Sequence, residues 1–109
     1  MPMIDAYIPD GALRPDAEAA LMNRLTEIVT GYEGFDPASP VVRSRSWVFL
    51  HRPAVYVGGL PAEAPYYKIV PSVPEGQLNE ADRAGVIADV TEAILDAEAG
   101  AWPREPDRV

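Results

Sequence analysis

Pro9-Asp10-Gly11-Ala12-Leu13 recurs 65 positions later as Pro74-Glu75-Gly76-Gln77-Leu78. A proline followed by an acidic residue and a glycine predicts a turn, because proline presets φ and glycine accepts a left-handed backbone. The same offset continues downstream, where Leu21 falls on Val86, Leu25 on Val90 and Thr26-Glu27 on Thr91-Glu92. An internal duplication is the economical explanation, so the chain reads as two copies of one unit.

Each copy places a strand before the turn and a helix after it. Residues 3–8 are mostly apolar and predict a short buried strand, and residues 15–32 carry apolar side chains at helical spacing. Pro15 suits a first helical turn. In the second copy, residues 66–73 predict the strand, and the helix begins after Asn79 as N-cap and ends at Gly100.

A further strand closes the first unit. Residues 44–50 (Ser-Arg-Ser-Trp-Val-Phe-Leu) supply β-branched and aromatic side chains at strand length, and a short extended piece, residues 55–57, precedes Gly58-Gly59. We expect one domain over 1–109, with a first βαβ unit over 1–59 and a second unit over 66–109. The predicted fold class is α+β (α/β), a duplicated βαβ fold whose mixed sheet carries two helices on one face.

The repeat also makes a prediction for the segment after the second helix. Adding 65 to residues 43–50 gives 108–115, and the sequence ends at Val109. The second unit is therefore expected to lack its closing strand, which leaves an unpaired sheet edge. We expect the chain to be a fragment; the alternatives are that another subunit supplies the strand or that it was lost.

The amino-acid composition limits which partners and which kinds of site are expected. With 9 basic and 17 acidic residues the formal net charge is −8, which disfavours nucleic acid and anionic membranes as partners. The chain has no cysteine and a single histidine, His51, so we expect neither disulfides nor Cys/His zinc sites. The expected chemistry is therefore metal-free. No signal segment or long apolar run is present, and the expected location is the cytoplasm.

Pro2 is the main candidate for catalysis. Once Met1 is removed, its nitrogen is a secondary amine, and an α-amino group has a reference pKa of about 7.7 to 8.0. Burial or a nearby guanidinium lowers that pKa, so the neutral amine can abstract a proton beside a carbonyl. If Met1 is retained, Pro2 is a tertiary amide without a basic nitrogen. The alternative is that this proline only marks a strand edge.

These features together resemble the tautomerase superfamily: a proline directly after the initiator methionine at the head of a strand, a duplicated βαβ unit, and the Val55-Tyr56-Val57-Gly58-Gly59 segment. The resemblance implies a trimer with six βαβ units around a central barrel. It also implies a reaction that needs no cofactor, with Pro2 as acid and base and a small α-keto or enol carboxylate as substrate.

The resemblance implies substrate-binding residues as well. The family often uses an arginine near the second strand, which points to Arg43 and Arg45, expected on one strand face; they equally suit surface charges. His51 and Arg52 follow that strand, where some longer members place a polar or acidic residue, although His51 also fits an ordinary strand end. Oxalocrotonate tautomerases carry an arginine after the glycine of the first turn, whereas this chain has Ala12.

Tyr66 and Tyr67 occupy the second unit's counterparts of Met1 and Pro2 and cannot repeat the amine chemistry. The leading hypothesis is a cofactor-independent keto–enol tautomerase. A dehalogenase or decarboxylase on the same scaffold is the enzymatic alternative, and it needs Pro2 protonated or a second group, such as His51, to activate water. A trimeric binding protein that has lost the chemistry is the third hypothesis.

Overall fold

A computed structural model describes residues 2–109 of the chain. Its elements, in chain order, are β1 (Met3–Tyr7), α1 (Pro15–Tyr32), α2 (Pro40–Ser44), β2 (Trp47–His51), β3 (Tyr56–Val57), β4 (Leu60–Pro61), β5 (Lys68–Ser72), α3 (Glu80–Ala97) and the 3-10 turn η1 (Pro106–Arg108). In the part described, no helix is long and apolar enough to cross a membrane.

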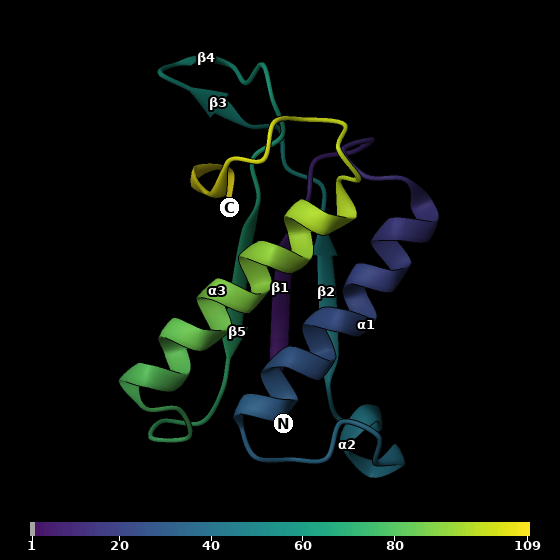
Figure 1. The fold of residues 1–109 in the computed structure, drawn as a ribbon, viewed down its shortest axis with the longest axis vertical. Helices are drawn as coiled ribbons and strands as arrows, with labels where there is room; N and C mark the ends of the chain where they lie inside the picture. The colour runs from purple at the N-terminus through teal and green to yellow at the C-terminus, as the bar shows by residue number, and fades with distance from the viewer. Residues whose placement is uncertain (1) are drawn as a thin grey trace.

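A three-stranded mixed sheet forms the centre, in the order β2-β1-β5. β1 runs parallel to β2, with Met3 opposite Trp47, and antiparallel to β5, with Met3 opposite Ser72. The two long helices lie side by side across one face of this sheet (Figure 1). The predicted mixed sheet with two helices on one face is confirmed.

The duplication is visible in the element bounds. The bounds of β1 and β5 differ by 65 at both ends, and so do those of α1 and α3. Because β1 and β5 are antiparallel neighbours, an approximate twofold rotation relates the two strand-and-helix units. A position in one unit therefore has a counterpart 65 residues away in the other, at the opposite end of the sheet.

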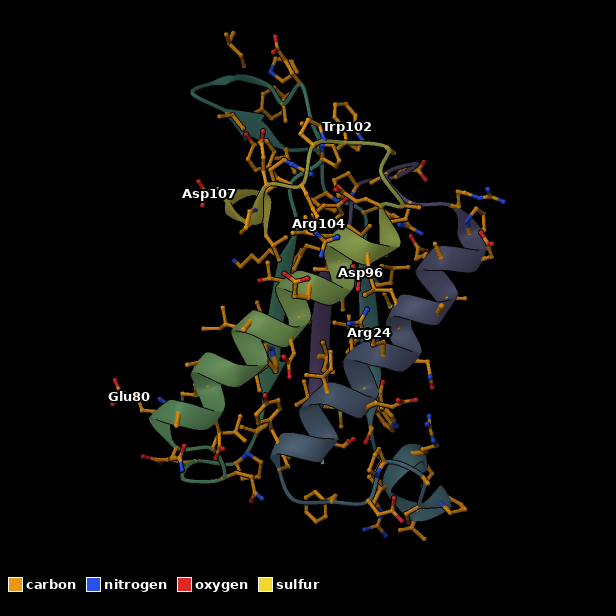
Figure 2. All side chains as sticks on the ribbon, in the orientation of Figure 1. Arg24, Glu80, Asp96, Trp102, Arg104 and Asp107 are labelled. Carbon is orange, nitrogen blue, oxygen red and sulfur yellow. The ribbon has the colours of Figure 1, made fainter. Side chains whose placement is uncertain are left out.

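The core lies between the sheet and the helices. Alternate side chains of β1 point to the helices, and these pack on the apolar stripes of α1 and α3, which gives a buried set of Ile4, Ala6, Ile8, Leu21, Leu25, Val29, Val86, Val90 and Ile94. Each large side chain so buried contributes roughly 1.5–3 kcal/mol. On the surface, Asp96 of α3 accepts from Arg24 of α1 at 2.9 Å and pairs with Arg104 at 3.0 Å (Figure 2).

The second helix begins as the sequence predicts. The Asn79 side chain accepts from the backbone N–H of Asp82, and the Asp82 carboxylate accepts from the N–H of Asn79, forming a capping box. This arrangement satisfies two N–H groups that have no partner within the helix. Gly100 follows the helix with φ of 79°, a left-handed conformation that glycine adopts without strain.

One expectation about a strand needs correction. The predicted strand over 44–50 begins only at Trp47: Arg43 lies in α2 and Arg45 is its C-cap, so the two arginines do not share a strand face. The Ser39 hydroxyl accepts from the N–H of Val42 and starts a helical turn too short for periodicity to reveal. Within residues 2–109 no strand follows α3, as the repeat predicts; a loop and η1 follow this helix.

Candidate active site

Pro2 lies buried immediately before the central strand β1. Its carbonyl oxygen accepts a hydrogen bond from the N–H of Trp47 at 3.1 Å, which extends the pairing of β1 with β2 by one step. The C-terminal end of α1 lies at the same end of the molecule as the start of β1 (Figure 1). Removal of Met1 concerns a residue outside the described range.

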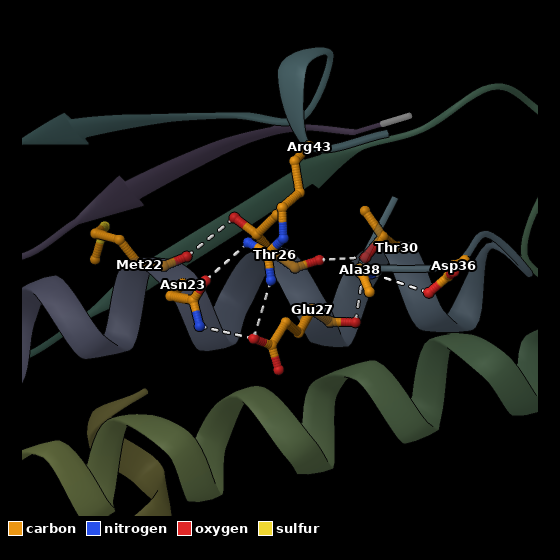
Figure 3. Close-up of polar contacts among 8 residues, drawn as sticks. All are labelled: Met22, Asn23, Thr26, Glu27, Thr30, Asp36, Ala38 and Arg43. Carbon is orange, nitrogen blue, oxygen red and sulfur yellow. Dashed lines mark hydrogen bonds and ion pairs between the residues drawn. The ribbon is translucent and has the colours of Figure 1, made fainter. Parts of the chain in front are cut away.

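Arg43 and Arg45 both belong to this end of the sheet, because they precede β2 and Trp47 lies opposite Met3. Arg43 turns toward α1, where it donates to Asn23 Oδ1 at 2.9 Å and to Glu27 Oε1 at 3.3 Å (Figure 3). Arg45 is exposed at the C-cap of α2. The structure therefore brings two cationic side chains to the end of the sheet where Pro2 lies.

His51 and Arg52 lie at the other end. His51 is opposite Tyr7, so the length of β1, about 13 Å at 3.3 Å per residue, separates it from the level of Met3. Arg52 forms a two-point ion pair with Glu18, at 2.7 and 2.6 Å, and its pKa is raised by this hydrogen bonding. Within one chain, the structure does not bring these two residues together with Pro2.

The sheet face opposite the helices is largely uncovered. On this open face, His51 Nε2 lies 2.7 Å from Asp5 Oδ1 and its ring stacks on Tyr7 with centroids 4.2 Å apart. Farther along, Trp47 and Phe49 form an edge-to-face pair, and their side chains are 53% and 47% exposed. Exposed aromatic side chains on a sheet face are typical of a surface that a partner covers.

Two cavities lie near opposite ends of the sheet. One, of about 460 Å³, opens at the His51 end between the loops after β1 and β2, with Trp102 in its wall. The other, of about 510 Å³, lies between the end of β5 and the start of α3, on the side of Pro2, and Arg83 is the charged residue in its lining. Sequence reasoning did not single out Arg83, because an arginine in a first helical turn has no distinguishing pattern.

A buried polar cluster was also missed. Glu98, after α3, accepts from the Tyr67 hydroxyl at 2.7 Å and from both terminal nitrogens of Arg108 at 2.6 and 2.7 Å. Burial raises the pKa of the Tyr67 phenol, and the hydrogen bond to Glu98 raises it further. Burial opposes ionisation of Glu98, but the hydrogen bonds from Arg108 and Tyr67 outweigh it and lower the pKa of Glu98.

No group of three or more His, Cys, Asp or Glu side chains among residues 2–109 is arranged to hold a metal ion. The polar groups of the described region are paired mainly with one another. What distinguishes the Pro2 end chemically is a buried proline, with Arg43 and Arg45 at the same end of the sheet.

Comparison with known proteins gives a clear result for the fold only. No protein-family model matches the sequence, and no curated protein matches it. Among solved structures, a fused 4-OT described as a symmetric trimer matches with a TM-score of 0.74 at 18% identity, covering 98% of this chain and 79% of that one.

Two further structures agree. Pt0534 inactivated by 2-oxo-3-pentynoate matches with a TM-score of 0.72 at 18% identity, over 94% of this chain and 77% of that one. The macrophage migration inhibitory factor of Toxoplasma gondii matches with a TM-score of 0.65 at 17% identity, over 94% and 80%. Nearly the whole chain thus has the fold of the tautomerase superfamily.

Proposed function

We propose that the mature protein, without Met1, is a cofactor-independent keto–enol tautomerase of a small α-keto or enol carboxylate. The observation that supports this best is the position of Pro2: it is buried at the head of the central strand of a tautomerase-type fold. A nitrogen placed there can move a proton between two atoms of the substrate, giving it to one atom and taking it from the other.

The cationic residues at the same end of the sheet would bind the carboxylate of the substrate. Arg45 is exposed beside the start of β2, and Arg43 is held by only two surface contacts that a substrate can replace. A guanidinium binds a carboxylate through two parallel hydrogen bonds and stabilises the negative charge of an enolate. We assign substrate binding to these two arginines in the first place.

The assembly we propose is a homotrimer that covers the open sheet face. Fused 4-OT structures of this fold are described as trimers, and the exposed Trp47 and Phe49 are suited to an interface. His51 and Arg52 can contact the substrate of Pro2 only if they come from another subunit, because in one chain they lie at the far end of the sheet. Their role in substrate binding therefore depends on the assembly.

Ketonisation of phenylenolpyruvate by wild type and by Pro2→Ala tests the proposal. We expect the variant to lose about 100-fold or more in kcat/KM, because alanine replaces the ring-fixed secondary amine with a primary amine that can rotate out of position. Pro61→Ala, at an exposed position in β4, is the matched control and should retain full activity. Equal rates for wild type and Pro2→Ala would rule out the tautomerase mechanism and leave the binding-protein hypothesis.

A further inference from the structure

Each half of the chain buries one glutamate just after its long helix. Glu33 is the C-cap of α1 and Glu98 the C-cap of α3, which is the offset of 65 that relates the two units. The two residues are 6% and 5% exposed, and each backbone N–H donates to the carbonyl four residues before it. Burying a carboxylate is costly unless a cation or hydrogen-bond donors face it, so both positions require explanation.

The second half shows what such a glutamate binds. Tyr67, the residue before β5, donates its hydroxyl to Glu98. Its counterpart in the first half, 65 positions earlier, is Pro2, the residue before β1. By the approximate twofold relation, Pro2 is expected to lie beside Glu33 in the first half, just as Tyr67 lies beside Glu98 in the second.

The arginine of the second half has an exposed counterpart. Arg108 lies 65 positions after Arg43, which belongs to α2, the helical turn that follows α1. Arg108 is 3% exposed, whereas Arg43 is exposed and donates to Asn23 and Glu27 on α1. The first half therefore turns this guanidinium to the surface, and the buried nitrogen of residue 2 is a cationic group that can face Glu33.

A hydrogen bond fixes Glu33 at the Pro2 end independently of the symmetry. Gln77, in the turn after β5, donates its side-chain amide to the carbonyl oxygen of Glu33 at 2.8 Å. That turn follows Ser72, which lies opposite Met3 in the sheet. Glu33 and Pro2 are thus both buried at the same end of the central strand.

We infer that Glu33 is the carboxylate partner of the mature Pro2 nitrogen and holds it as the ammonium, so that Pro2 enters the reaction as a proton donor. This inference rests on the proposed function, since it requires that Met1 be removed. The ammonium gives its proton to the enol carbon, and the enol hydroxyl returns its proton to the amine, which balances the isomerisation. Glu33 is a positioning residue that acts through Pro2.

Other charged groups at this end are more exposed. They are Asp36 between α1 and α2, Arg43 on α2, Arg45 before β2, Glu75 after β5, and Glu80, Asp82 and Arg83 on α3. Arg43 is neutralised by Glu27, and exposed charges are weakened by water and salt. The buried carboxylate acts in a lower dielectric than any of them, so it decides the charge of Pro2.

The experiment measures how fast 2-oxo-3-pentynoate alkylates Pro2 as a function of pH, with mass spectrometry to locate the adduct. Only the neutral amine adds to the alkyne carbon, with its proton passing to the neighbouring carbon, so the rate rises through the pKa of the amine. For wild type we expect a midpoint above 8, the upper limit of the ordinary range. Glu33→Gln should move the midpoint down by about 1–3 pH units, as loss of an opposite charge does.

Glu75→Gln, which removes an exposed carboxylate at the same end, is the matched control and should leave the midpoint within about 0.3 units. A wild-type midpoint below 7.7, or equal midpoints for wild type and Glu33→Gln, would overturn the role of Glu33. The wild-type midpoint decides the matter even if Glu33→Gln does not fold. If no adduct forms on Pro2 at any pH and Met1 is still attached, it is the proposed function that fails.

Discussion

Arg108 and Glu98 carry opposite charges into the interior, where neither is stable alone. Arg108 also donates to the carbonyl oxygens of Pro65 and Pro103, at 3.0 and 2.7 Å, so its guanidinium is well satisfied. Since Tyr67 N–H donates to the Arg108 carbonyl at 2.7 Å, the cluster joins the C-terminal turn to the start of β5. A single residue thus holds together segments that are distant in the sequence.

Arg108→Met should lower the free energy of unfolding by about 3–5 kcal/mol, because it leaves the Glu98 carboxylate buried without its cation. Urea denaturation followed by circular dichroism measures the change. Arg104→Met is the control: it removes an arginine whose partners Glu92 and Asp96 are largely exposed, and it should have a much smaller effect. Similar losses for the two variants would show that the cluster does not stabilise the fold.

The same cluster predicts how stability depends on pH. The pKa of Glu98 is lowered on folding from its ordinary value of 4.5, so its contribution is present above that pH and is lost as the pH falls through the folded value. The difference in unfolding free energy between wild type and Glu98→Gln should therefore shrink on acidification below pH 4.5. A difference that stays constant from pH 7 to pH 3 would contradict the lowered pKa.

The long elements follow from the sequence because their signals are local and repeated. An 18-residue helix shows its apolar stripe several times over, and the second copy of the stripe fixes the register of the first. α2 was not predicted because its five residues contain little more than one helical turn, which is too short to show a periodic apolar pattern. Glu33 escaped for a different reason: its burial arises from the packing of β1, α1 and the turn at Gln77, which only the folded chain brings together.

At the contact between α1 and α3, Gly85 faces the ring of Tyr32. A Cβ at residue 85 would lie 2.5 Å from the Tyr32 hydroxyl oxygen, and that hydroxyl donates to Asp89 at 2.8 Å. Gly85→Ala should therefore displace the tyrosine and lower the melting temperature, although alanine favours helix. Gly31→Ala, in open space on α1, should instead stabilise by about 0.5–1 kcal/mol. Stabilisation by both changes would mean that the helix contact is loose.

The whole molecule presents one covered and one open sheet face. Helices cover the first face (Figure 1). Trp47 and Phe49 lie exposed on the second face. Trp47→Glu combined with Phe49→Lys should leave the chain folded but reduce its mass in multi-angle light scattering from three chains to one, because charges at the centre of an interface are strongly disfavoured. The exposed surface pair Arg24→Gln and Asp96→Asn is the control and should remain trimeric. A wild-type monomer would refute the proposed assembly.

The proposed chemistry depends on a free amine at residue 2. Mass spectrometry of the N-terminal peptide of the protein, purified from its native host, tests this most directly. We expect this peptide to begin at Pro2, with no methionine before it and no added acyl group. A mass that includes Met1, or an acylated Pro2, would contradict the proposed chemistry, because the nitrogen would then be an amide unable to carry a proton.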